Sequence, residues 1–215
     1  GALHAGGIGA GPMNRVATVA GREIPVSALD ERESRLRAGA LAPSLPAPGS
    51  SEGRQLRRWL TQLLVADEVV RVAAAELGVT DGDAPAEADL LPDAAARMEL
   101  GSIAAAALEQ PLGRALFVRV TADVQVSDDE IGRYHARNPL RFALPVPGPG
   151  GWCTAPTIAP ELDQVRPQIT AYLLGSARRR AFRHWLDARR AESVHLAPGY
   201  EHPGDPRQPD HVHRH

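Results

Sequence analysis

The feature that most constrains the fold is a long apolar repeat in the first half of the chain. Apolar residues recur there at steps of three and four: Leu56, Leu60, Leu63, Val70, Ala74 and Leu77. This spacing places them on one face of an α-helix, and Gly78 follows where a C-terminal cap is expected. A second repeat comprises Leu162, Val165, Ile169, Leu173, Ala177 and Leu186, with Pro167 near its start. Because such helices are stabilised mainly by burying their apolar faces, we expect one shared core, made of Leu60, Leu63, Leu77, Leu173 and Leu186.

Shorter patterns predict a small β-sheet and two capped helices. Residues 15–26 read RVATVAGREIPV, two β-favouring runs around Gly21-Arg22, which indicates a hairpin. Residues 194–196, Val-His-Leu, are a candidate for a third strand beside it. Two serines have an acidic residue three positions later, which is the pattern of a helix start: Ser27 with Asp30, and Ser127 with Glu130.

The middle of the chain is less regular. Pro92 is placed to start a third helix that runs to Gln110 and is weakened by Gly101, and Pro111 marks its end or a kink. Residues 112–120 fit a helix or a strand. Residues 38–53 are rich in Ala, Pro, Gly and Ser without periodicity, which predicts a loop.

These patterns divide the chain into three parts. Residues 1–13 form a flexible N-terminal segment or tag, residues 14–196 form a mainly α core with a small β-hairpin, and residues 197–215 form a His/Pro-rich tail. Within the core, residues 143–160 are a short Pro/Gly-rich connection. We expect one domain, since 215 residues rarely make more than two.

Composition excludes several classes of partner. With 24 basic and 26 acidic residues the formal charge is −2, so nothing indicates binding to nucleic acid or to an acidic membrane. Every basic residue is arginine, which with abundant Ala, Gly and Pro is typical of a high-GC, actinobacterial source. A single cysteine excludes an internal disulfide, and no apolar run reaches the ~20 residues of a membrane span. We therefore expect a cytoplasmic protein without a signal peptide.

The order of these elements resembles the SurA/PrsA family of parvulin-associated peptidyl-prolyl isomerases and chaperones. The segments VATVAGREIPVSAL and LRRWLTQLLVADEVVRVAAAELGV are similar to that family's opening strand, turn and first two helices. VQVSDDEIGRYHARNPLRF resembles the segment that leads into the parvulin domain, and VRPQITAYLLGSARRRAFRHWLDARRAESVHL resembles the final helix. Between Phe142 and Leu162, where the family inserts that domain, fewer than twenty residues remain. The opening turn has Ala20 where the family has Asn.

The resemblance implies a chaperone core without parvulin activity. The protein would hold an extended apolar chain, a peptide or a carrier-protein-bound acyl chain, in a helical groove. Alternatively, the same scaffold is a natural-product enzyme, such as an isomerase or tailoring enzyme acting on a polyene or acyl substrate. A third possibility is a subunit that completes its core across a homodimer interface.

Candidate chemistry is concentrated in the tail. His211, His213 and His215 alternate, so in an extended strand they face one side and could share a divalent metal such as zinc. His202, Asp205, His211 and His213 are also candidate catalytic residues, if the proline-stiffened tail folds back into one pocket. The alternative interpretation is a disordered polar tail.

Two further candidates for acid–base chemistry lie in the core. Tyr134 and His135 are adjacent on the helix that Ser127 caps and could act as proton donor and base. Cys153 is a possible nucleophile and His184 an ordinary helix histidine. The run Arg178-Arg179-Arg180 and the pair Arg189-Arg190 are expected to be solvated, or to bind an anionic carrier protein or phosphopantetheine.

Overall fold

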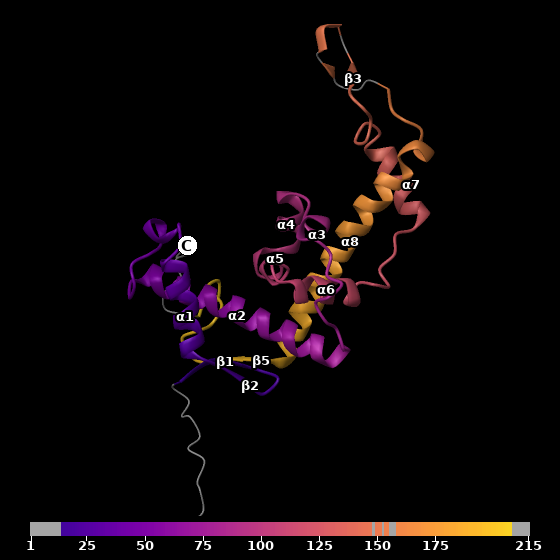
Figure 1. Ribbon diagram of the computed structural model, residues 1–215. Helices are drawn as coiled ribbons and strands as arrows, with labels where there is room; N and C mark the ends of the chain where they lie inside the picture. Colours follow the sequence, from indigo (N-terminus) through magenta and orange to yellow (C-terminus); the bar gives the residue numbers. More distant parts are fainter. Residues whose placement is uncertain (1–13, 148, 152, 155–157, 208–215) are drawn as a thin grey trace, which may run out of the picture.

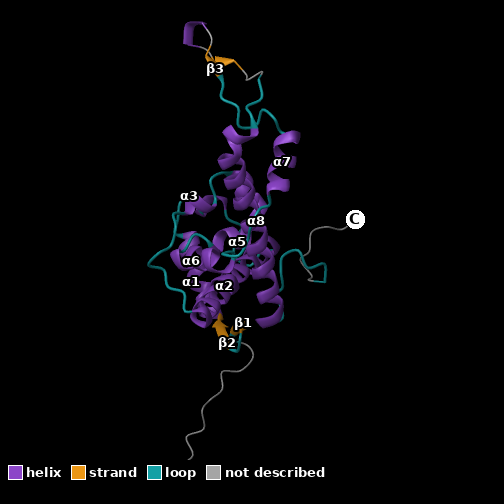
Figure 2. Ribbon diagram, turned by 90° about the vertical axis from the view of Figure 1, so that its right-hand side faces the viewer, coloured by secondary structure: helices purple, strands orange, loops and turns teal. Residues whose placement is uncertain are grey.

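The computed structural model describes residues 14–147, 149–151, 153–154 and 158–207. The described chain is mainly helical and carries a small three-stranded antiparallel sheet. Figures 1 and 2 show two regions: a helical body that contains the sheet, and an arm that projects from it. The arm consists of α7 (Asp128–Arg137), the first half of α8 (Leu162–Ser193), and the connection between them, with the short strands β3 (Val146–Pro147) and β4 (Cys153–Thr154) at its tip.

The sheet joins the two ends of the core. β1 (Arg15–Val19) and β2 (Arg22–Pro25) form the predicted hairpin, and β5 (Val194–Leu196) pairs with β1 on its other side, as the sequence indicated. Residues Ala20 and Gly21 make the turn with φ of 48° and 79°. Positive φ at both central residues matches the twist of a tight hairpin, a conformation that Asn-Gly adopts more readily than Ala-Gly.

The first two helices have different starts. α1 (Val26–Arg37) begins one residue before Ser27, with Pro25 as its N-cap and no side-chain cap, so the predicted capping box of Ser27 and Asp30 is wrong. α2 (Ser51–Leu77) is the predicted long helix and ends at Gly78, whose φ of 64° is the left-handed conformation of a C-cap. It begins inside the expected loop because the Ser50 hydroxyl accepts a hydrogen bond from the Gly53 amide.

The middle of the chain contains more breaks than the sequence predicted. The expected helix over 92–110 is divided into α4 (Ala94–Leu100) and α5 (Ser102–Ala107), because Gly101 adopts φ 85° and ψ 154°. A short α3 (Glu87–Leu90) and the 3-10 turn η1 (Ala42–Ser44) precede them, and a second 3-10 turn, η2 (Pro149–Gly151), lies in the arm. Residues 112–120 are helical, since Pro111 starts α6 (Pro111–Val120) instead of ending a helix.

The main core lies where α2, α4, α5, α6 and the second half of α8 meet the sheet. Phe182 of α8 is fully buried, with its ring 5.2 Å from that of Phe117 and stacked on Trp185 at 5.5 Å. Leu60 and Leu186 are buried in this core, and Leu63 packs against it. Two members of the predicted core are elsewhere: Leu77 is 42% exposed at the end of α2, and Leu173 lies in the separate core of the arm.

The segment after β5 returns along α2. The Arg58 side chain donates to the carbonyl oxygen of Gly199 at 3.1 Å, and the Gln62 amide donates to that of Tyr200 at 3.4 Å. Tyr200 packs against the main core. The described part of the tail is therefore anchored on the body. None of the described helices combines the length and apolar character that a membrane span requires.

Candidate functional site

The candidate site is a groove between α7 and α8 on the arm. Ser127 caps α7 as predicted: its hydroxyl accepts from the Glu130 amide at 3.3 Å, and the Glu130 carboxylate accepts from the Ser127 amide at 2.8 Å. The Ser127 amide, and then the Ser127 hydroxyl, donate to this carboxylate, which lowers the pKa of Glu130 and keeps it ionised. Ile131 then packs against Val165 and Ile169 of α8. Cap and contact together fix the angle at which α7 meets α8.

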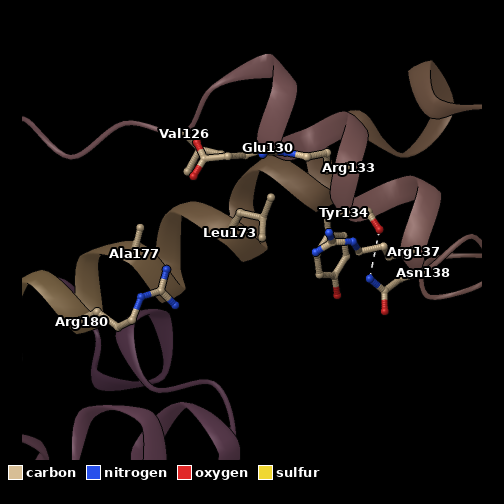
Figure 3. Close-up of a pocket in the computed structure, with 9 residues that line it drawn as sticks. All are labelled: Val126, Glu130, Arg133, Tyr134, Arg137, Asn138, Leu173, Ala177 and Arg180. Atoms are coloured by element: carbon tan, nitrogen blue, oxygen red, sulfur yellow. Dashed lines mark hydrogen bonds between the residues drawn. The ribbon is translucent and has the colours of Figure 1, made fainter.

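The groove holds about 330 Å³ and combines an apolar floor with a polar rim (Figure 3). Val126, Leu173, Ala177 and the ring of Tyr134 supply its apolar surface. The polar residues that line it are Glu130, Arg133, Arg137, Asn138 and Arg180. In Figure 3 Arg137 and Arg180 stand at opposite ends of the groove, so a long, narrow ligand would meet a cation at each end.

The rim carries an excess of positive charge. Glu130 is the one carboxylate among the lining residues, and its Oε2 accepts two hydrogen bonds from Ser127 in the cap. Arg180 pairs with Glu99 at 3.0 Å, and Arg133 donates to the carbonyl oxygen of Asp129 at 3.2 Å. Arg137 has no hydrogen-bond or ion-pair partner within the part of the chain that the structure describes. Its guanidinium is therefore available to a carboxylate of a ligand.

Tyr134 of the groove belongs to an aromatic cluster. The Tyr134 ring lies 5.4 Å from that of Tyr172 and 6.4 Å from that of Phe142, and the Arg141 guanidinium lies 5.5 Å above Tyr172. Burial, followed by the neighbouring Tyr172, raises the pKa of Tyr134. The phenol is protonated at neutral pH, as an ordinary tyrosine is, and can donate a hydrogen bond.

Exposed apolar side chains continue from this cluster toward the tip of the arm. Leu144 is 85% exposed and Ile158 is 81% exposed, and Leu140 and Tyr172 are exposed as well. Exposed large apolar side chains gathered on one projecting region indicate an interaction surface. We call the four exposed side chains of the arm, Leu140, Leu144, Ile158 and Tyr172, the arm surface.

The structure separates the two neighbouring candidates on α7. Tyr134 lines the groove, whereas His135 is outside its lining, where the His135 ring Nε2 donates to the carbonyl oxygen of Pro160 at 2.9 Å. That contact ties α7 to the residues before α8. As a catalytic pair, Tyr134 and His135 stay a prediction.

The described tail candidates have different surroundings. His202 lines a second cavity, between α5 and α8, and burial followed by nearby Arg190 lowers its pKa. Asp205 lies near His202 in the chain, but its carboxylate binds Arg207 at 2.8 Å, which lowers the pKa of Asp205 to about 2. Asp205 does not line the cavity.

The remaining candidates bring no metal site together in the described chain. His211, His213 and His215 lie outside the described residues, so the predicted zinc site is untested. Across residues 14–147, 149–151, 153–154 and 158–207 no group of three His, Cys, Asp or Glu side chains is placed to hold a metal ion. Cys153 lies in β4, and His184 is exposed on α8.

Sequence reasoning identified Tyr134 but missed the groove around it. Arg133 and Arg137 are four residues apart on α7, a spacing that places both on one helix face and was the available signal. Arg180 was treated as part of a solvated run. Arg180 lies at the groove because of where α7 crosses α8. The residue pattern within one helix does not predict that crossing point.

Comparison with known proteins yields one partial match. The model of a family of unknown function, DUF7158, matches residues 15–52, which cover β1, β2, α1 and the start of α2. No curated protein and no solved structure matches the chain. The match lies entirely in the body and does not extend to the arm.

Proposed function

We propose that this protein is a SurA/PrsA-like binding module that holds an extended apolar polypeptide segment on its arm, without isomerase activity. The family resemblance supports this proposal through the position of residues 142–162. In the family this is where the parvulin domain is inserted, and here the described part of this stretch, with β3 and β4, forms the far end of the arm (Figure 1). The arm is thus presented away from the body, where a polypeptide can reach it.

The observation that carries the proposal is the arm surface. Its exposed leucines, isoleucine and tyrosine lie on the arm, which also carries the groove with the apolar floor, so the arm offers an extended segment several apolar contacts. Burying one such side chain contributes roughly 1.5–3 kcal/mol. A few contacts of this size give the moderate affinity expected of a protein that must also release its ligand.

The polar rim indicates which polar side chains the bound segment carries. Arg137 is unpaired in the described structure, and Arg133 is bonded only to a backbone carbonyl. Both can bind carboxylates, so the preferred segment alternates apolar residues with Asp or Glu. An extended chain suits this arrangement because its side chains alternate between faces every ~3.3 Å.

A matched pair of double variants tests the assignment. Replacing Leu144 and Ile158 by Ser removes two exposed apolar contacts from the arm, while replacing Leu41 and Met98 by Ser removes two of similar exposure, 61% and 77%, from outside it. Binding is measured by fluorescence anisotropy with a labelled peptide of alternating Leu and Asp. Losing the two apolar contacts should weaken binding by at least ~1.4 kcal/mol. The arm variant should therefore bind at least about tenfold more weakly.

The control variant should bind as the wild type does, and both should unfold at the wild-type temperature. Equal weakening in the two variants, or no weakening in either, would contradict the arm as the binding surface. A peptide with Lys in place of every Asp provides a second check, since it should bind more weakly if Arg137 contributes.

The alternative, a natural-product enzyme, has one observation in its favour: His202 lines a cavity. Acid–base catalysis by His202 would need a partner there: Asp205 is engaged by Arg207, and no hydrogen bond joins His202 to Asp187, the carboxylate that lines the same cavity, in the described structure. The binding function therefore has the stronger support.

A further inference from the structure

A second cavity, independent of the arm surface, lies between α5 and α8 and holds about 310 Å³. Arg183, Asp187 and Arg190 reach it from α8, where steps of three and four residues place them on one helix face. His202 reaches it from the segment that returns along α2. Three parts of the chain that are distant in sequence thus converge there.

Arg190 is the central group of this cavity. It is half-buried, and its guanidinium donates to the amide oxygen of Gln62. No carboxylate of the described residues lies within ion-pair distance of it, and burial lowers its pKa. A guanidinium carries five N–H donors, so one neutral acceptor leaves most of its hydrogen-bonding capacity unused.

Arg183 and His202 add further donors. Arg183 has no ion-pair partner in the described chain. The His202 Nδ1 accepts a hydrogen bond from the Gly204 amide at 3.0 Å, so in the neutral ring the proton is on Nε2, which can donate to a ligand. Asp187 supplies one carboxylate against two guanidiniums, and the cavity therefore has a net positive charge.

The rest of the lining consists of apolar side chains together with Gly101 and the hydroxyl-bearing Ser102. Leu100, Ala104 and Leu186 are buried side chains of the main core that form one wall, and Ile103 stands beside them. Inorganic phosphate alone would leave this wall uncovered. The volume and lining are suited to a small molecule with an anionic head and a short hydrocarbon body.

We propose that this cavity binds a small amphipathic anion, whose carboxylate or phosphate head contacts Arg190, Arg183 and His202 and whose short apolar body packs on Ile103, Ala104 and Leu186. Guanidinium groups match both heads through paired N–H···O hydrogen bonds. The site differs from the arm groove in location and lining, so either can exist without the other.

The test compares hexanoate, hexyl phosphate, hexanamide and inorganic phosphate on the full chain. Affinity is measured by titration calorimetry, and the ring signals of His202 are followed by NMR. Hexanoate or hexyl phosphate should bind and shift the His202 signals, and the tighter of the two identifies the head group. Hexanamide, which has the same body without the charge, should bind at least about tenfold more weakly.

Two variants locate the binding. Arg190→Gln should weaken it by about tenfold or more, whereas the control Arg189→Gln should not, because Arg189 is the adjacent arginine and faces Glu76. If Arg190→Gln does not fold, Arg183→Gln provides the same comparison, because Arg183 is exposed.

The proposed site would be overturned by equal binding of hexanamide and hexanoate, by unmoved His202 signals, or by full affinity in both cavity variants. Binding of inorganic phosphate without either hexyl ligand would overturn the apolar part of the assignment. Peptide binding to the arm should be the same in all these variants.

Discussion

The body and the arm are held together by cores of very different size. In the body, the sheet, α1, α2, α4, α5, α6 and the second half of α8 bury a continuous set of side chains that includes Val16, Leu29, Leu108, Phe182 and Leu186. In the arm the buried apolar residues of the described structure are Ile131, Val165 and Ile169, with partly buried neighbours. The single helix α8 belongs to both regions.

This difference indicates two levels of local stability in one chain. The free energy of local opening follows the amount of apolar surface that the region buries, so the arm should open more readily than the body. An arm that carries the binding surface on a small core can adjust to different segments while the body stays folded. The following predictions test that contrast, from the largest expected effect to the smallest.

Removing the central aromatic residue of the body should affect the whole fold. Phe182→Ala leaves a cavity beside Phe117 and Trp185 in the main core, and such a change typically costs about 3–5 kcal/mol. Chemical denaturation should show one cooperative transition shifted to lower denaturant for both regions. If only the arm unfolds earlier, the body is not the cooperative core.

The corresponding change in the arm should act locally. Ile169→Ala removes a fully buried side chain from the small core and should cost about 2–4 kcal/mol there. Hydrogen exchange should accelerate in α7 and in the first half of α8. Equal acceleration in α2 would show that the two regions unfold as one.

The hairpin turn offers a stabilising change in the body. Ala20 has a left-handed φ of 48°, a conformation that costs an ordinary L-residue ~1 kcal/mol or more and that Asn tolerates better. Ala20→Asn should therefore raise the free energy of unfolding by about 0.5–1 kcal/mol, measured by denaturation. Ala20→Val, which is β-branched, should lower it.

Docking of the returning segment should depend weakly on pH. Burial and Arg190 hold the pKa of His202 below its ordinary value of 6.5, while Asp205 acts in the opposite direction; Arg183 and Asp187 also face the cavity. The unfolded state then binds the proton more readily than the folded state. The contribution of neutral His202 to the stability of the docked segment is therefore complete above pH ~6.5. It is lost as the pH falls through the pKa of His202 in the folded state.

Limited proteolysis of residues 197–207 between neutral and mildly acidic pH checks this dependence. Cleavage should increase on acidification in the wild type and change less in His202→Gln. The arm, measured by cleavage of residues 143–160, should show no such dependence on His202.

The last prediction concerns an absent effect. Because residues 143–160 are too few to form a parvulin domain, the protein should not accelerate prolyl isomerisation of a standard peptide. A protease-coupled assay measures the rate, and acceleration comparable with a parvulin would contradict the proposed core-only organisation.

The sequence alone determined the elements whose signals are local. The periodic repeats predicted α2 and α8, Gly78 the end of α2, the Ser127–Glu130 pair the start of α7, and the β-favouring runs both the hairpin and its third strand. Each of these depends on side chains and backbone groups a few residues apart, where propensity and capping act.

Only the tertiary structure decided which apolar faces meet and where the cavities form. Leu173 and Leu186 belong to the same predicted repeat, yet Leu173 packs in the arm core with α7 and Leu186 in the main core, because the first half of α8 leaves the body. Leu77 belongs to the α2 repeat but lies at its exposed end. Arg180 and Arg190 appear equivalent in sequence, and packing alone distinguishes an arginine at the arm groove from one in the α5–α8 cavity. A periodic pattern records which side of a helix is apolar, and the partner of that side is set by contacts between residues far apart in the chain.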